Sequence, residues 1–199
     1  MDASPTHTLP SDNDAPTAGI ESEPRLAPIE EPDSWWVWLA YKIAEWTEGT
    51  VITPMKVVQA RLPESLRPAY ETQKLEENLS LPVALRLLLK RSVAFLNGCA
   101  FCIDLTEADA EVQDVDVDKL RAVAEYETSD RFSAAERAAL AYAEAVTEDV
   151  HVDDATFEAL RDHFSEREIV EITWLCATEN YWNRLSGPLN IGSDGLCSV

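Results

Sequence analysis

The sequence is poor in histidine, lysine and glycine, and it has no long run of apolar residues. Its 199 residues include three histidines, six glycines and five lysines. It has no glycine-rich nucleotide fingerprint and no flavin, haem or metal motif, so no cofactor is predicted. The most apolar stretches, Trp35–Trp46 and Leu81–Leu96, are too short or too interrupted to cross a bilayer. We therefore expect no membrane span.

Basic residues are also scarce compared with acidic ones. Sixteen lysines and arginines face 37 aspartates and glutamates, which leaves a net charge of -21. No concentrated basic patch is present, so nucleic acid and anionic membranes are not expected as partners. The acids are spread along the chain, as in proteins of salt-loving archaea. There, molar salt screens the repulsion between like charges, because the Debye length is roughly 3 Å at 1 M. The alternative is an ordinary acidic protein.

The chain has four cysteines, too few for a secreted disulfide scaffold. Its N-terminus shows no basic region that leads into an apolar run, the pattern of a signal peptide. We therefore expect a cytoplasmic protein. In a reducing compartment, a close pair of cysteines indicates redox or metal chemistry.

The chain divides into a polar N-terminal segment and one domain. Residues 1–33 hold six of the eleven prolines and almost no large apolar residues, so we predict that this segment is disordered. Residues 34–199 show helical patterns without strand alternation, so the predicted fold class is all-α. Residues 71–78 are expected only to lead into the next element. The expected helices cover residues 35–46, 55–61, 81–96, 99–110, 115–126, 133–147, 153–164 and 165–186.

The first of these helices is unusually aromatic, with Trp35, Trp36, Trp38 and Trp46 in twelve residues. An interfacial membrane anchor usually carries a polar face rich in lysine and arginine, whereas this helix has only Lys42. Packing against the rest of the domain or against a neighbouring subunit is the favoured interpretation.

The strongest chemical signal is the pair Cys99 and Cys102 in the stretch NGCAFCIDLTEADA. Residues three apart on a helix share a face, so the two thiols can form a disulfide. If Cys99 lies in the first turn, backbone N–H groups and the helix dipole lower its thiol pKa. Two alternatives stay open: inert core cysteines, or half of a zinc site completed by Cys176, Cys197 or scattered histidines.

Around these cysteines the chain resembles the AhpD-like (carboxymuconolactone decarboxylase-like) family, whose members carry an NGCAFCID core. The likeness continues through Phe132–Thr147 and Phe157–Leu185 and covers about half of the chain. It implies an all-helical homo-oligomer, often a trimer or hexamer, with a CxxC pair that cycles between dithiol and disulfide. It also implies that Cys102 attacks the peroxide and Cys99 resolves the sulfenic acid, whereas the helix-dipole argument favours Cys99 as the more acidic thiol.

The chain departs from the family's peroxidase pattern at two positions. The histidine four residues after the second cysteine is replaced by Thr106, which cannot relay a proton. A family glutamate twelve residues before the first cysteine corresponds to Leu87. Glu144, flanked by small residues, is the substitute proton carrier that we predict, with a solvated helix position as the alternative. Asp104 is less suitable because a nearby carboxylate opposes thiolate formation, and Glu107 lies on another face.

The resemblance favours a thiol-dependent oxidoreductase, peroxidase-like, that acts on a hydroperoxide or disulfide substrate. Its electrons would come from a thioredoxin-like or lipoyl partner. An alternative is a redox-sensing or structural oligomer that lost efficient turnover when Thr106 replaced histidine. A lactone decarboxylase, suggested by the family's name, is disfavoured because that reaction does not use a CxxC pair.

We expect the fold to be lost at low ionic strength and restored in molar salt, because a net charge of -21 repels itself when it is unscreened. Thermal unfolding followed by circular dichroism over a salt series measures this. A melting temperature that is indifferent to salt would assign the chain to ordinary acidic proteins instead.

Overall fold

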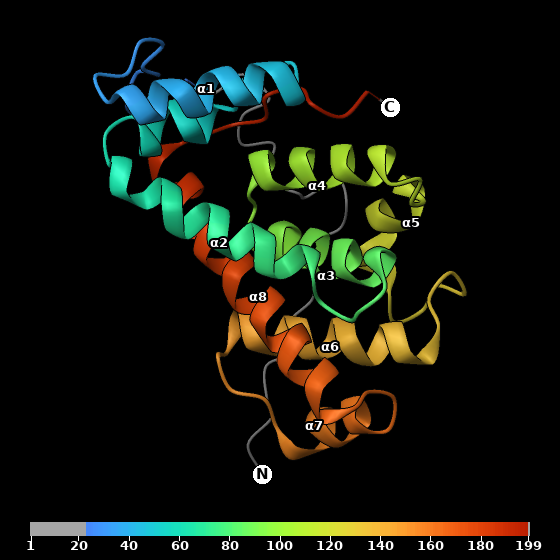
Figure 1. The fold of residues 1–199 in the computed structure, drawn as a ribbon. Coiled ribbons are helices and arrows are strands. Elements are labelled where there is room, and N and C mark those ends of the chain that lie inside the picture. The colour runs from blue at the N-terminus through green and yellow to red at the C-terminus, as the bar shows by residue number, and fades with distance from the viewer. Residues whose placement is uncertain (1–22, 199) are drawn as a thin grey trace.

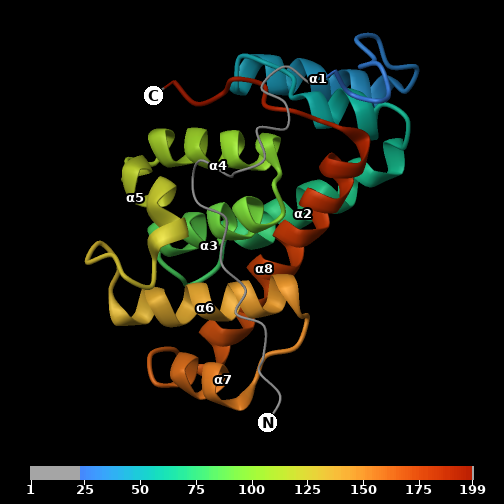
Figure 2. The same ribbon diagram turned by 180° about the vertical axis from the view of Figure 1, so that it is seen from behind.

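A computed structural model describes residues 23–198, and every regular element in this range is a helix (Figures 1 and 2). The predicted all-α class is therefore confirmed. The α-helices are α1 (Trp35–Thr47), α2 (Leu66–Glu77), α3 (Val83–Leu96), α4 (Ala100–Val112), α5 (Val117–Arg121), α6 (Ala134–Glu148), α7 (Asp154–Arg161) and α8 (Glu166–Ser186). The short helices are η1 (Met55–Gln59), η2 (Pro63–Ser65), η3 (Ala122–Glu125) and η4 (Gly187–Leu189).

Helix α3 lies at the centre of the fold, as its apolar residues on nearly every side predict. It packs against α4, α6 and α8, with α4 and α6 on opposite sides of it (Figures 1 and 2). Leu88, Leu89 and Val93 of α3 are at most 1% exposed and share one core cluster with Leu140 of α6 and Ile172 of α8. This cluster sets the position of α3 and therefore of the loop that follows it.

Local signals set the starts of the two long C-terminal helices. Ser133 with Glu136 at α6, and Ser165 with Glu168 at α8, form complete capping boxes, as their spacing predicts. Helix α8 ends at Ser186, the end of its predicted range, with Gly187 as its C-cap.

Two expectations about the helices were incomplete. Helix α2 begins at Leu66, although the sequence indicated only a polar lead-in over residues 71–78. Its one buried side chain is Glu76, whose carboxylate contacts Lys90 of α3 and Thr178 of α8. Because α2 is held by polar contacts, its sequence has no stripe of apolar residues from which the helix could be predicted. The single helix expected over residues 115–126 is instead the short α5 followed by the 3₁₀ helix η3.

The prediction of disorder through residue 33 was wrong for its last part. Residues 23–33 follow an irregular path along the domain, and hydrogen bonds hold their backbone. Arg25 N donates to Leu189 O over 2.9 Å, Ile29 N donates to Lys56 O over 3.1 Å, and Ile29 O accepts from the Tyr41 hydroxyl over 3.0 Å. These polar anchors replace the apolar burial that the composition lacks. Residues 1–22 lie outside the described residues.

Helix α1 packs on the domain along one face only. Val37 and Tyr41 are 0% and 3% exposed and contact a small cluster that includes Val51 and Met55. The tryptophans of α1 lie on its outer side and stay exposed. Among the described residues, no helix is long and apolar enough to cross a membrane.

Candidate functional site

The two cysteines lie at the junction of α3 and α4. Asn97 is the C-cap of α3, Gly98 adopts φ +63°, and Cys99 is the N-cap of α4. Glycine adopts this left-handed conformation without the steric cost that a side chain would bring. Cys99 and Cys102 are joined in a disulfide with their Cα atoms 5.3 Å apart, as their spacing allows.

The disulfide is buried and sits at the start of a helix. Cys99 and Cys102 are 3% and 4% exposed, in a cluster with Val57, Phe101 and Ile191. The backbone N–H of Cys102 points at Cys99 Sγ over 3.4 Å. In the reduced protein, this N–H and the helix N-terminus favour a thiolate on Cys99.

Residues 191–198, here called the C-terminal strap, pass between α1 and α4 in both ribbon views (Figures 1 and 2). Ile191 and Leu196 of the strap pack in the cysteine cluster. Asp104 anchors the strap: its carboxylate accepts hydrogen bonds from Ser193 Oγ over 2.8 Å, and from the backbone N–H groups of Leu196 and Cys197 over 2.9 Å each. The strap therefore limits access to the sulfur atoms.

The strap's hydrogen bonds also determine the charge of Asp104. Burial raises the pKa of this carboxyl, but the hydrogen bonds from Cys197, Leu196 and Ser193 outweigh it and hold the pKa below its ordinary value. Asp104 thus anchors the strap as an ionised group. Two further acids hold the same segment, since Asp194 accepts from Thr53 and Glu111 accepts from Ser198.

Thr106 and Glu107 have structural partners. The Thr106 hydroxyl, 3% exposed, donates to the Cys102 carbonyl over 2.7 Å, so it fixes the first turns of α4. The Glu107 carboxylate accepts from Arg91 of α3 over 2.9 Å and from Arg121 of α5 over 2.8 Å. The hydrogen bonds of these two side chains brace α4 and its neighbours.

The structure does not bring Glu144 to the cysteine pair. Glu144 belongs to α6, which lies across α3 from α4 (Figures 1 and 2). Its carboxylate accepts from the Tyr126 hydroxyl over 2.7 Å. Glu144 is therefore partly buried, as a predicted proton carrier would be, but on the other side of the central helix.

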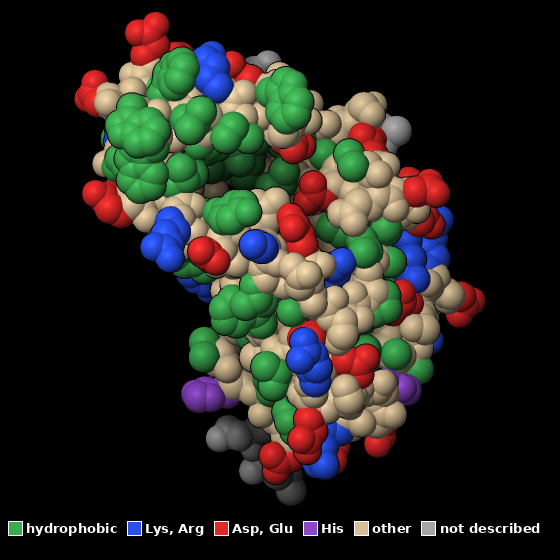
Figure 3. Space-filling view, in the orientation of Figure 1, with side chains coloured by type: hydrophobic (Ala, Val, Ile, Leu, Met, Phe, Trp, Pro, Cys, Tyr) green, Lys and Arg blue, Asp and Glu red, His purple; other side chains and the backbone are tan. Residues whose placement is uncertain are grey.

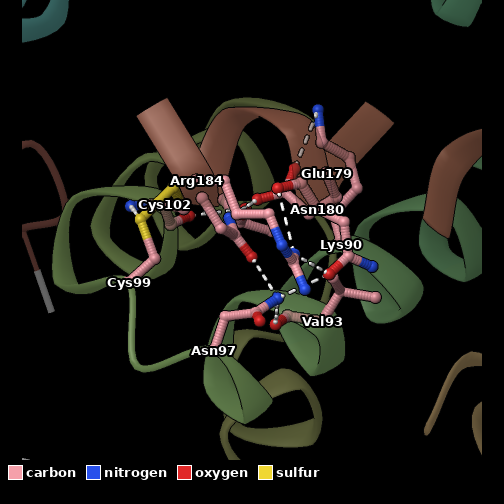
Figure 4. Close-up of a disulfide and its surroundings, with 10 residues drawn as sticks. Lys90, Val93, Asn97, Cys99, Cys102, Glu179, Asn180 and Arg184 are labelled. Carbon is pink, nitrogen blue, oxygen red and sulfur yellow. Dashed lines mark hydrogen bonds and ion pairs between the residues drawn. A yellow bond between two sulfur atoms is a disulfide. The ribbon is translucent and has the colours of Figure 1, made fainter. Parts of the chain in front are cut away.

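A different carboxyl, Glu179 of α8, lies in the surroundings of the disulfide (Figure 4). It is 3% exposed and accepts a hydrogen bond from Asn183 Nδ2 over 2.7 Å. Asn97, at the end of α3, donates to the side-chain oxygens of Asn183 and Asn180 over 2.9 Å each. This amide network connects Glu179 to the turn that carries Cys99.

Glu179 is the titratable group that sequence reasoning missed. Burial raises its pKa to about 7, although Lys90, with Nζ 4.0 Å from the carboxylate, and the Asn183 hydrogen bond pull the pKa down. Burial would lower the pKa of Lys90, but Glu179, Glu76 and Asp109 outweigh it and raise the pKa. Thr178 and Asn180 flank Glu179 in the sequence, so no local pattern distinguished this carboxyl from a solvated one.

The other two cysteines occupy different environments. Cys176 is 0% exposed, and burial raises its pKa to about 12, so it is protonated at neutral pH. Cys197 is partly exposed between Glu111 and Arg121. Within residues 23–198, no group of three or more metal-ligating side chains could hold an ion, which leaves the zinc alternative without support there.

Comparison with known proteins supports the family that the cysteine motif resembles. The profile of the Carboxymuconolactone decarboxylase family matches residues 66–145, which include both cysteines. The uncharacterized protein YnjA of Escherichia coli is 35% identical over 120 residues, which are 60% of this chain and 66% of YnjA, just under two thirds of its length.

Solved structures share the helical arrangement. A protein of unknown function from Agrobacterium tumefaciens, with the suggested name antioxidant defence protein AhpD, is 27% identical with a TM-score of 0.65, over 69% of this chain and 96% of that one. The debrominase Bmp8 is 23% identical with a TM-score of 0.72, over 85% and 91% of the two chains. The likeness to Bmp8 is one of fold alone.

Replacing Asp104 with alanine should release the strap and speed alkylation of the reduced Cys99–Cys102 pair several-fold, because the strap's anchor is lost. Timed alkylation with mass spectrometry measures the rate. In the wild type, the ionised Asp104 carboxylate holds the strap fully at any pH above its ordinary pKa of 3.8. This stabilisation is lost as the pH falls through the lower pKa that Asp104 has in the folded protein. Asp130→Ala, at an exposed position, is the control; equal rates for all three proteins would show that the strap is no barrier.

Proposed function

We propose that this protein is a thiol-dependent oxidoreductase, peroxidase-like, that cycles Cys99 and Cys102 between dithiol and disulfide. The observation that carries the proposal is the disulfide at the N-terminus of α4, with the buried carboxyl of Glu179 in its surroundings (Figure 4). The family match and the name of the Agrobacterium protein support antioxidant chemistry. Neither contributes a substrate, so a hydroperoxide or a disulfide is the proposed substrate class.

The reaction with a hydroperoxide balances without a cofactor. One thiolate attacks the peroxide oxygen, which forms a sulfenic acid and releases an alcohol, or water from hydrogen peroxide. The second thiol attacks the sulfenic sulfur, which forms the disulfide and releases water. A dithiol donor, thioredoxin-like or lipoyl, then returns two electrons and two protons by thiol–disulfide exchange.

The buried carboxyl of Glu179 is suited to change the charge near the cysteine pair as the pH passes through neutrality. A thiol must lose a proton before it attacks, and the departing oxygen must gain one. A group with a pKa of about 7 changes protonation in the range where both steps proceed. We assign Glu179 a positioning role, because it acts through Asn183 and Asn97 rather than on the sulfur atoms.

Two alternative functions, a redox sensor and a debrominase, are each favoured by a different observation. A redox sensor is favoured by Thr106, whose hydroxyl is committed to the Cys102 carbonyl, and by the burial of the disulfide under the strap. A sensor oxidises once and does not turn over. Reductive debromination is favoured only by the shared fold with Bmp8.

The direct test is to incubate the reduced protein, in high salt, with hydrogen peroxide or an organic hydroperoxide while a dithiol is resupplied. We expect sustained peroxide loss, and mass spectrometry should find a Cys99–Cys102 disulfide. Cys99→Ser and Cys102→Ser should each abolish turnover, whereas Cys197→Ser, the matched control, should retain it. Trapping the sulfenic acid in each single variant identifies the cysteine that attacks.

The outcomes separate the alternatives. A disulfide without repeated turnover would assign the protein to the sensors. Thiols that stay reduced and unreactive would end the redox account. Bromide release from a brominated aromatic compound, without peroxide consumption, would assign it to the debrominases.

Replacing Glu179 with glutamine should slow peroxide turnover by about ten-fold, because the variant loses the ionisable group that acts on the cysteine turn through Asn183 and Asn97. The change in rate near pH 7, where the carboxyl ionises, should disappear with it. The measurement is the pH profile of turnover, and Glu144→Gln is the comparison, because Glu144 is the other predicted carrier. If Glu179→Gln keeps the wild-type rate and profile while Glu144→Gln loses them, the role belongs to Glu144.

A further inference from the structure

Helix α1 presents a second apolar face that the other residues of the described range 23–198 leave partly exposed. Trp36, Leu39, Ile43 and Trp46 follow one another at spacings of three, four and three residues. This is the spacing by which one helix packs against another along a seam. The opposite face, with Val37 and Tyr41, already contacts the domain, so the outer stripe is free to meet a partner.

The exposed apolar area on α1 is too large for an ordinary monomer surface. The exposed fractions of Trp35, Trp36, Trp38 and Trp46 are 74%, 40%, 50% and 86%. Together they equal about two and a half whole tryptophans, or roughly 600 Å² at about 250 Å² each. Leu39 and Ile43, 44% and 53% exposed, enlarge the same surface. The total approaches the ~800 Å² that each partner buries in a standard interface, and it exceeds the few hundred Å² usual on monomers.

Position and charge restrict what the partner can be. Helix α1 lies at one end of the molecule, and hydrophobic side chains gather over that end (Figures 1 and 3). Its only basic residue is Lys42, which is paired with Glu45 over 2.7 Å. The helix has no further cation, so it lacks the lysine- and arginine-rich polar face by which interfacial helices bind anionic lipid. An uncharged apolar surface of matching length is favoured instead.

The stripe is complementary to a copy of itself. Read from either end of the helix, the stripe has a large side chain, two of medium size and another large one, at the same spacings of three, four and three residues. In an antiparallel pair about a two-fold axis, Trp36 therefore meets the partner's Trp46, and Leu39 meets the partner's Ile43. Both contacts occur twice, as an isologous interface requires. The charged pair Lys42–Glu45 lies beside this seam.

We propose that α1 pairs with α1 of a second copy of this chain through the Trp36–Leu39–Ile43–Trp46 stripe, in an antiparallel, two-fold symmetric interface. The assembly is therefore a dimer or a larger oligomer that contains two-fold axes, such as a hexamer. The interface is independent of the cysteine chemistry.

The test is the molar mass of the full chain by light scattering and sedimentation, in high salt. We expect a dimer or hexamer for the wild type. Ile43→Lys should at least halve the mass, because it places a charge at the centre of the seam. Val112→Lys, the same kind of change at a position that is 87% exposed at the far end of α4, should leave the mass unchanged. Circular dichroism verifies that each variant is folded.

A milder variant keeps the test decisive if the lysine unfolds α1. Trp46→Ala removes a side chain that is 86% exposed and leaves the domain core intact, so the dissociation constant should rise at least ten-fold. A monomer at all concentrations would overturn the proposal, as would a trimer without two-fold axes. So would an unchanged mass for both variants, or a monomer that sediments with vesicles of anionic lipid.

Discussion

The turn between α3 and α4 is the constraint on which the rest of the site depends. Helix α3 is held on several sides by the core and cannot shift, so the chain leaves it at a fixed point. Gly98 reverses the chain within one residue through its positive φ, and Cys99 then becomes the N-cap of α4. The path of the backbone through this turn therefore places the cysteine pair at the free N–H groups of the first turn of α4.

The acidic residues near the cysteines have two kinds of role. Asp104 and Glu107 hold structural elements together, whereas Glu179 has a pKa near neutrality. Asp104 holds the strap, and Glu107 joins α3, α4 and α5 through two arginines. Both have partners that favour their charge. Glu179 is buried beside Lys90, and there the cost of burial prevails. A carboxyl beside a redox pair is chemically useful when it can be neutral at physiological pH, and Glu179 meets that condition.

The sequence predicted what local chemistry decides. Capping residues marked the starts of α6 and α8, and the CxxC spacing marked the disulfide. It could not predict α2, whose Glu76 is stabilised by residues 14 and 102 positions away in the chain. Glu144 lies between two alanines, whereas Glu179 lies between Thr178 and Asn180, so the sequence favoured Glu144. Only the packing of α6 and α8 around α3 places Glu179 in the surroundings of the cysteines and Glu144 across the central helix.

The proposed function requires that Cys99 and Cys102 form one reversible two-electron couple. Its most direct measurement is the fraction of each cysteine oxidised, by mass spectrometry after thiol trapping, across buffers of graded dithiol–disulfide ratio. We expect the two cysteines to become oxidised together in a single two-electron transition. Cys176 should remain reduced throughout, because it is fully buried. A pair that stays in one state over the whole range, or Cys99 and Cys102 that oxidise separately, would contradict the account.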